Sequence, residues 1–183
     1  MGISLSHTRY EEIKKIVVDV FAKYNVSCVP VSSFELATKM GVKVIPYSAI
    51  PASKRWLLLK KSEDGFLVEK SIGEWYIYYN DKMDYGRINN TIMHEIGHIA
   101  LDHSEDSELA EKEVKFFAKY ALVPPVLVHK LELDNPHDIS RIFDVSLEAA
   151  QYALDYYRKW LTYGNKDYTN YELRLLRLFD EAV

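Results

Sequence analysis

The sequence predicts an α+β fold in which a small, twisted and mainly antiparallel sheet precedes a helix with two histidines and a C-terminal helical segment. Two observations predict it. Segments rich in β-branched and aromatic residues gather between residues 42 and 80, and helical periodicity dominates after residue 104. The length of 183 residues suits one domain. We expect a single unit over 1–183, with a core at about 1–130 and the helical segment at about 131–183.

Composition narrows the class of protein. Hydrophobic residues make up 48% and charged residues 27% of the chain, as in soluble globular proteins. The formal net charge of −4 disfavours nucleic acid as a direct partner. Cys28 is the only cysteine, so no internal disulfide is possible, which fits a reducing compartment. The sequence shows neither a signal-peptide pattern nor an apolar run of about 18 residues. We therefore expect a cytoplasmic protein with no membrane partner.

The first part of the chain predicts two helices. Apolar residues fall on one stripe of residues 8–24, which indicates an amphipathic helix. A shorter helix is predicted within 32–41, because Ser32 and Glu35 have capping-box spacing and Gly41 can end a helix.

Strands are predicted next. Four segments have strand character, at residues 42–47, 54–61, 66–70 and 74–80. The Asp64-Gly65 pair predicts a hairpin between the second and third of these strands, and Gly73 predicts a turn before the fourth. Hairpins join antiparallel strands, so the sheet is expected to be mainly antiparallel.

The chain after residue 104 predicts helices. One spans 107–122 and ends before two prolines, residues 138–161 form two helices with a short turn, and a last helix covers 170–179. The pair at 138–161 resembles a helix-turn-helix. From residue 136 onward six Lys/Arg face eight Asp/Glu, whereas a DNA reader needs positive charge. We therefore expect this pair to pack on the rest of the protein.

The segment NNTIMHEIGHIALDH, residues 89–103, contains the candidate metal-binding and catalytic residues. His94 and His98 are four residues apart, so on a helix they share one face and can reach the same Zn²⁺ ion. Glu95 follows the first histidine and is turned aside, where it can act on a water molecule instead of binding the metal. Gly97 lies inside this helix at a cost of about 1 kcal/mol, which the close approach of another element would offset.

A catalytic zinc needs a third protein ligand. His103, an acid of the 102–108 loop or an acid of the next helix could supply it. His103 lies near a helix end, where it ordinarily serves as a cap. The extended metzincin pattern is excluded, because Leu101 and Ser104 stand where that pattern needs glycine and histidine.

The acids of the next helix differ in their helical neighbours. Glu108 and Glu111 have mostly polar neighbours, whereas Glu113 lies in the apolar stripe. A carboxylate in such a place must be paired or bound to a metal. We assign Glu113 as the third ligand, which is the gluzincin arrangement; the alternative for Glu113 is a buried ion pair with Arg87 or Arg141.

With these residues in place, the sequence resembles the ImmA/IrrE family of zinc metallopeptidases from about residue 10 to residue 160. The matching segments are FELATKMGVKV, WYIYYND, TIMHEIGHIALDH, EVKFFAKYALVPP and FDVSLEAAQYAL. The resemblance implies a gluzincin-like (zincin-like) fold and gives Glu113 the role of third ligand. The departures, Asn90, Val114-Lys115 and Ala153, remove no ligand and no base.

The resemblance also implies a function. Family members act in the cytoplasm, typically on helix-turn-helix repressors of mobile elements or stress responses, so we expect a zinc-dependent endopeptidase with such a repressor as its partner and substrate. The alternative is a non-catalytic zinc-binding regulator that acts by holding a partner protein. An extended peptide substrate would add to a sheet edge along residues 75–80. Five residues are candidate donors to the oxyanion: Tyr78, Tyr79, Tyr85, His103 and His129.

Overall fold

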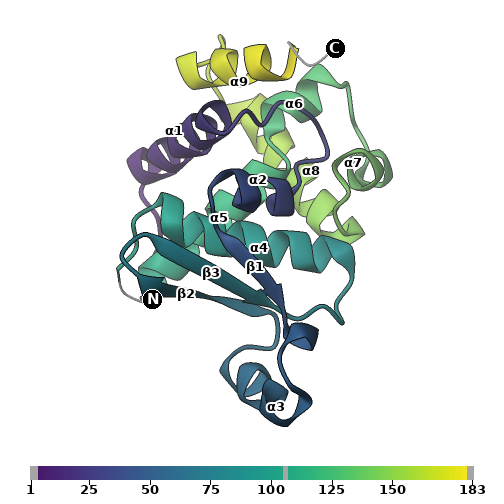
Figure 1. The fold of residues 1–183 in the computed structure, drawn as a ribbon. Coiled ribbons are helices and arrows are strands. Elements are labelled where there is room, and N and C mark those ends of the chain that lie inside the picture. Colours follow the sequence, from purple (N-terminus) through teal and green to yellow (C-terminus); the bar gives the residue numbers. More distant parts are fainter. Residues whose placement is uncertain (1–3, 105–106, 181–183) are drawn as a thin grey trace.

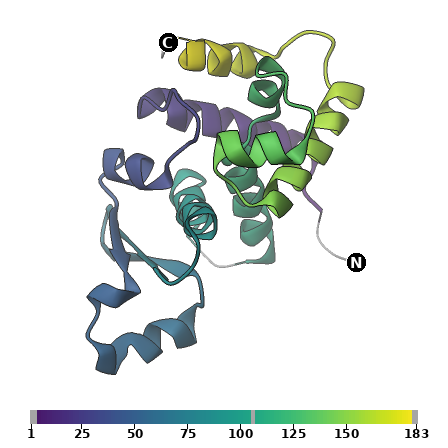
Figure 2. The ribbon, with the colours of Figure 1, turned by 90° about the vertical axis from the view of Figure 1, so that its right-hand side faces the viewer.

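The structure is a computed structural model that describes residues 4–104 and 107–180, and it has the predicted α+β architecture (Figures 1 and 2). Its helices, in chain order, are α1 (His7–Lys23), α2 (Ser33–Lys39), α3 (Ala52–Lys61), α4 (Tyr85–Ala100), α5 (Glu108–Leu122), α6 (Pro125–Lys130), α7 (Pro136–Phe143), α8 (Leu147–Tyr163) and α9 (Asn170–Asp180). Its strands are β1 (Lys43–Pro46), β2 (Gly65–Ser71) and β3 (Glu74–Tyr79).

Side-chain caps fix where several helices begin. The Ser32 hydroxyl accepts a hydrogen bond from the backbone N–H of Glu35 at 3.3 Å, which confirms the predicted start of α2. The Ser107 hydroxyl accepts from the N–H of Ala110 at 3.0 Å at the start of α5. Asp84 caps α4 in the same way. Each cap satisfies an N–H group that has no partner within its helix, so these helices begin at defined residues.

The sheet has three strands in the order β1-β3-β2. β2 pairs with β3 in antiparallel register, with Gly65 opposite Tyr79. β1 pairs with β3 in parallel register, with Lys43 opposite Tyr76. The sheet is therefore mixed, and β3 is its central strand. The expectation that residues 75–80 offer a free edge is wrong, because both sides of β3 are paired.

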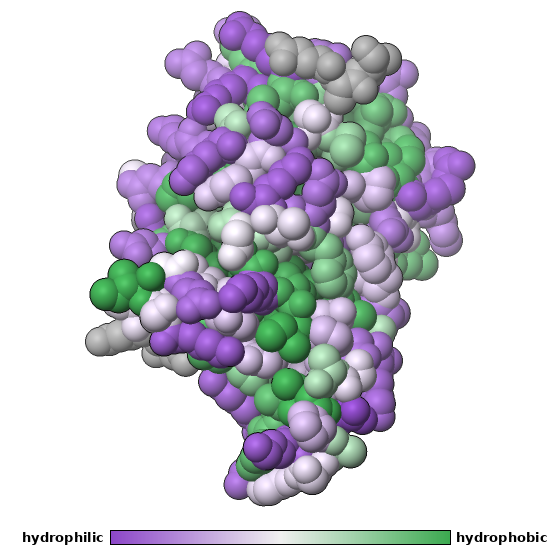
Figure 3. Space-filling model, in the orientation of Figure 1, coloured by the Kyte–Doolittle hydropathy of each residue, from purple (hydrophilic) through white to green (hydrophobic). Residues whose placement is uncertain are grey.

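The predicted strand at 54–61 is helix α3 instead. Its apolar run of three leucines fits either period, whereas its Leu, Lys, Arg and Ala residues are good helix formers. Asp64-Gly65 therefore joins a helix to β2 and is not a hairpin. The predicted turn at Gly73 is confirmed between β2 and β3, where Gly73 has a φ of 76°. In Figure 1, α3 lies beyond the lower end of the sheet, and Figure 3 shows hydrophobic surface there.

Helix α4 occupies the centre of the molecule. In Figure 2 it is seen end-on between the sheet and the C-terminal helices. It contacts α2, β2 and β3 on one side and α5 on the other. Ile92, Met93 and Ile96 are fully buried in these contacts. The helix that carries the two histidines is thus held rigidly between two layers.

The C-terminal helices were predicted closely. α7 and α8 pack on each other, joined through Asp144 in a left-handed conformation (φ 51°). α8 also contacts α6, and α9 returns to lie against α1. Short helix α6 was not predicted; it begins at Pro125, a residue that suits the first turn of a helix.

Gly97 explains how closely α5 approaches α4. A methyl group at this position would lie 3.1 Å from Cδ1 of Phe117 and 3.3 Å from Cβ of Val114, both fully buried on α5. The expected close approach is confirmed, and side chains of α5 make it. Glycine at position 97 lets the two helices that bear the metal-binding residue types pack in direct contact.

We predict that Gly97→Ala lowers the free energy of unfolding by up to about 2 kcal/mol. Overpacking costs about 1–3 kcal/mol, and the gain in helix propensity, about 1 kcal/mol, offsets only part of it. Denaturant unfolding followed by circular dichroism measures the change.

Gly86→Ala is the matched control, because it lies in the same helix and its added methyl would meet neighbours only at 3.5 Å or beyond. This variant should be neutral or more stable than the wild type. A Gly97→Ala protein as stable as Gly86→Ala would contradict the packing account.

Candidate metal centre

His94 and His98 lie one turn apart on the same face of α4, and their ring centroids are 5.2 Å apart. Their side chains are 18% and 11% exposed. Burial lowers the pKa of the His94 imidazole, although nearby Glu111 opposes this effect. Neutral imidazole is the form that binds a metal, so the protein environment of His94 favours the state that a ligand needs.

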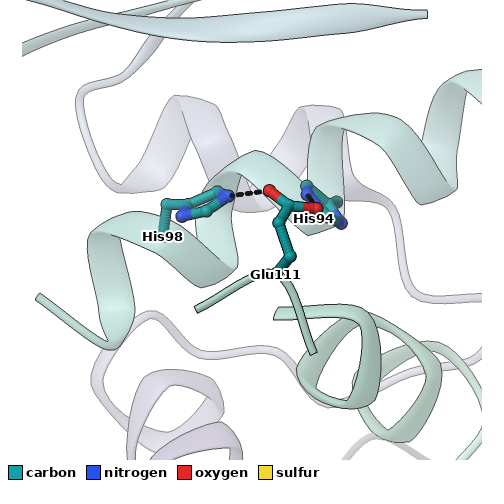
Figure 4. Close-up of side chains that lie close together, drawn as sticks. All are labelled: His94, His98 and Glu111. Carbon is teal, nitrogen blue, oxygen red and sulfur yellow. Dashed lines mark ion pairs between the residues drawn. The ribbon is translucent and has the colours of Figure 1, made fainter. Parts of the chain in front are cut away.

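Glu111 of α5 supplies the carboxylate of the cluster. Its Oε1 lies 3.4 Å from Nε2 of His98, and its Oε2 lies 3.6 Å from Nε2 of His94. Figure 4 shows the carboxylate between the two imidazole rings. The ligand atoms of the three residues all lie within 4.8 Å of one another.

These separations fit a metal ion. Two donors at about 2.0–2.1 Å from a tetrahedral zinc lie about 3.3 Å apart, and the two measured N–O distances are 3.4 and 3.6 Å. Two neutral imidazoles and one carboxylate are also a donor set that catalytic zinc takes in proteins, with one position left for water or substrate. The residues present therefore fit a divalent metal of this kind.

Glu113, the ligand expected from the sequence, lies elsewhere. The residue is 5% exposed, and its carboxylate accepts two hydrogen bonds from Arg9 of α1, from Nε to Oε1 at 2.7 Å and from Nη2 to Oε2 at 2.6 Å. His103 contacts Oε2 as well, at 2.9 Å. The hydrogen bonds from Arg9 keep the pKa of Glu113 below its usual value, although burial opposes this shift. The structure brings Glu111, not Glu113, to the two histidines.

Helical geometry explains why only one of the two glutamates, Glu111, lies beside His94 and His98. Residues two apart on a helix point about 200° apart, so Glu111 and Glu113 cannot face the same neighbour. The polar neighbours of Glu111 indicated a solvated face, and that face opens onto the pocket beside the histidines. The apolar setting of Glu113 correctly indicated a buried partner, but the ion pair is with Arg9. Arg87 pairs with Asp64 and Arg141 with Asp138.

The sequence missed Glu111 and Arg9. The signal for Glu111 was its position four residues after the cap Ser107, in the first turn of α5, the helix that packs against α4. No local signal identified Arg9, because its partner is 104 residues away along the chain.

A pocket of 430 Å³ opens over this cluster. Glu95, His98 and Glu111 line it. The other lining residues come from α3, the sheet and the loop after α4: Lys61, Gly65, Phe66, Leu67, Trp75, His103 and Ser104. Glu95 is 8% exposed. The predicted base thus shares a pocket with His98 and Glu111.

Only His103 of the five candidate oxyanion donors lines this pocket among the described residues. Tyr79 and Tyr85 contact the ring of Phe34, and Tyr78 stacks on Phe66. His129 contacts the hydroxyl of Tyr157 in the C-terminal segment.

The α+β fold thus brings two histidines and a glutamate together beside a pocket, a donor set that metal-dependent hydrolases use. The chain matches the family model for the IrrE N-terminal-like domain, a peptidase family, over residues 37–155. It belongs to this family of metallopeptidases, as the resemblance implied. The chain has no significant match among curated proteins.

We propose His94, His98 and Glu111 as the metal ligands, with Glu111 in place of Glu113. Glu111→Gln should weaken zinc binding by more than about 100-fold, because loss of a residue that only hydrogen-bonds a metal ligand already costs about 10–100-fold. Competition with a chromophoric chelator measures the affinity.

Glu108→Gln, one turn earlier on α5, is the control and should bind zinc as the wild type does. Its carboxylate is exposed and pairs with Lys112. Wild-type affinity in Glu111→Gln would remove Glu111 from the ligand set.

Proposed function

We propose that this protein is a zinc-dependent endopeptidase that cuts one specific cytosolic protein, a helix-turn-helix repressor of a mobile element or stress response. One observation carries the peptidase part. His94, His98 and Glu111 form one cluster, and two of its members, His98 and Glu111, share a pocket with Glu95, in a chain that belongs to a metallopeptidase family.

The roles of the residues follow from their positions. Bound zinc would polarise the scissile carbonyl and lower the pKa of water at the site. The carboxylate of Glu95 accepts a proton from the attacking water and later gives it to the leaving amine. Glu95 is nearly buried, which shields this transfer from bulk water. As metal ligands, His94 and His98 would be in the neutral form.

The peptide would bind along β2. Because β3 is the central strand, the edge strands of the sheet are β1 and β2. β2 contributes Gly65, Phe66 and Leu67 to the lining of the pocket. A substrate that adds to this edge gains main-chain hydrogen bonds while its scissile bond lies over the cluster. This replaces the expectation that residues 75–80 receive the peptide.

The family resemblance and charge support a helix-turn-helix repressor as substrate. The chain has a net charge of −4, which attracts a basic DNA-binding protein weakly. The same charge disfavours direct DNA binding by α7 and α8, which pack on each other. No helix in the described part of the chain combines the length and the apolar character needed to cross a membrane.

We predict that Glu95→Gln abolishes cleavage and leaves zinc affinity within about 2-fold of the wild type, because the glutamate acts on water and does not bind the metal. Zinc affinity and cleavage are measured on the same preparations. Retained biological activity in this variant would favour the alternative, a zinc-binding regulator that holds its partner without cutting it.

We also predict selectivity. The zinc-loaded protein should cut the helix-turn-helix protein encoded beside it at one site and leave casein intact, and mass spectrometry maps the new termini. Glu95→Gln incubated in parallel controls for contaminating proteases. Rapid degradation of casein by the wild type would defeat the proposal of a selective enzyme.

A further inference from the structure

The turn after α4 brings His103 back against the metal-binding face. Asp102 adopts a left-handed conformation with a φ of 54°, and the backbone N–H of His103 donates to the carbonyl of His98 at 3.1 Å. Nδ1 of His103 then lies 3.3 Å from Nδ1 of His98, and its Nε2 lies 2.9 Å from Oε2 of Glu113. A continuous chain of contacts therefore runs from Arg9 through Glu113 and His103 to His98.

The acceptor at the far end of this chain is fixed. The Arg9 guanidinium donates one hydrogen bond to each carboxylate oxygen of Glu113, so both oxygens of this carboxylate act as acceptors. Nε2 of His103 must therefore carry a proton and donate a hydrogen bond to Oε2 of Glu113. When His103 is neutral, its Nδ1 has no proton and is an acceptor.

Because Nδ1 of neutral His103 is an acceptor, it determines which ring nitrogen of His98 carries the proton. The 3.3 Å contact joins two Nδ1 atoms, so the proton between them must come from His98. His98 then has its proton on Nδ1 and a free electron pair on Nε2, the atom that lies 3.4 Å from Glu111. This is the tautomer that binds a metal at the cluster.

We propose that Glu113 and His103 are positioning residues that hold His98 in its metal-binding tautomer, with Arg9 as the anchor of Glu113. The carboxylate accepts a hydrogen bond from the Nε2–H group of His103, which leaves Nδ1 of His103 as an acceptor for His98. A carboxylate acting through a second imidazole raises the basicity of the ligand and fixes its ring orientation. The buried glutamate expected to bind the metal directly thus acts on it through two histidines.

The inference rests on the proposed ligand set, but its most direct test needs no metal. In metal-free protein labelled with ¹⁵N-histidine at pH about 8.5, well above the usual histidine pKa, long-range ¹H–¹⁵N correlation shows which ring nitrogen carries the proton. We expect the proton of His98 on Nδ1 and that of His103 on Nε2. In His103→Phe, His98 should become a mixture of tautomers. A wild-type His98 with its proton on Nε2 would overturn the proposal.

Zinc affinity provides the second readout. His103→Phe and Glu113→Gln should each bind zinc about 10–100-fold more weakly than the wild type. Because Glu113 acts through His103, adding Glu113→Gln to His103→Phe should change the affinity by less than about 2-fold, as a double-mutant cycle measures. Wild-type zinc affinity in either single variant would contradict the proposed link from Glu113 through His103 to His98. So would a double variant in which the two losses of affinity multiply.

Controls separate this effect from loss of stability. Glu172 of α9 is also buried, at 4% exposed. It accepts hydrogen bonds from Trp160 and Thr169, and neither of these partners belongs to the metal-binding cluster. Glu172→Gln should keep wild-type zinc affinity even where it lowers stability. His103→Phe leaves the pair of Arg9 and Glu113 in place, so it reports on the chain even if Glu113→Gln folds poorly. Absence of cleavage with both readouts as expected would count against the proposed function alone.

Discussion

The contact between α4 and α5 at Gly97 is the constraint on which the site depends. Two histidines on one helix make an incomplete metal site, and the third donor must come from another element. Phe117 and Val114 of α5 occupy the space that a side chain at Gly97 would need, so α5 lies directly on α4. The cost of that glycine, about 1 kcal/mol in helix propensity, is offset by the burial of two apolar side chains and by the position this gives to the acids of α5.

Helix α5 then presents two glutamates with different partners. Glu111 faces the half-exposed pocket and lies between the histidines, whereas Glu113 faces inward and is held by Arg9. The carboxylate of Glu113 contacts His103, and His103 contacts His98, so Glu113 is linked to the same cluster. Because Arg9 belongs to α1, the N-terminal helix is tied to the metal-binding face by an ion pair that is nearly buried on the Glu113 side.

Much of the fold was predictable, because its helices begin with local signals such as Ser32 and Ser107 and follow apolar stripes. The segment 54–61 was not, since a run of leucines fits a helix and a strand equally and only tertiary structure decides. At the site, the helical spacing of His94 and His98 and the close approach at Gly97 could be inferred from the sequence. Which of Glu111 and Glu113 lies beside His94 and His98 could not be inferred, because the polarity of helical neighbours distinguishes only buried from exposed faces, and Glu111 approaches the histidines from an exposed face. Arg9 was beyond reach, since long-range pairing leaves no local pattern.

The central claim is that Glu111 completes the site while Glu113 supports it from behind. A crystal structure of the zinc-loaded protein, with the ion located by its anomalous scattering, tests this most directly. The account predicts zinc at about 2.0–2.2 Å from Nε2 of His94, Nε2 of His98 and a carboxylate oxygen of Glu111, with Glu113 still bound to Arg9 and His103. A zinc ion bound by Glu113, with Glu111 turned into solvent, would contradict it.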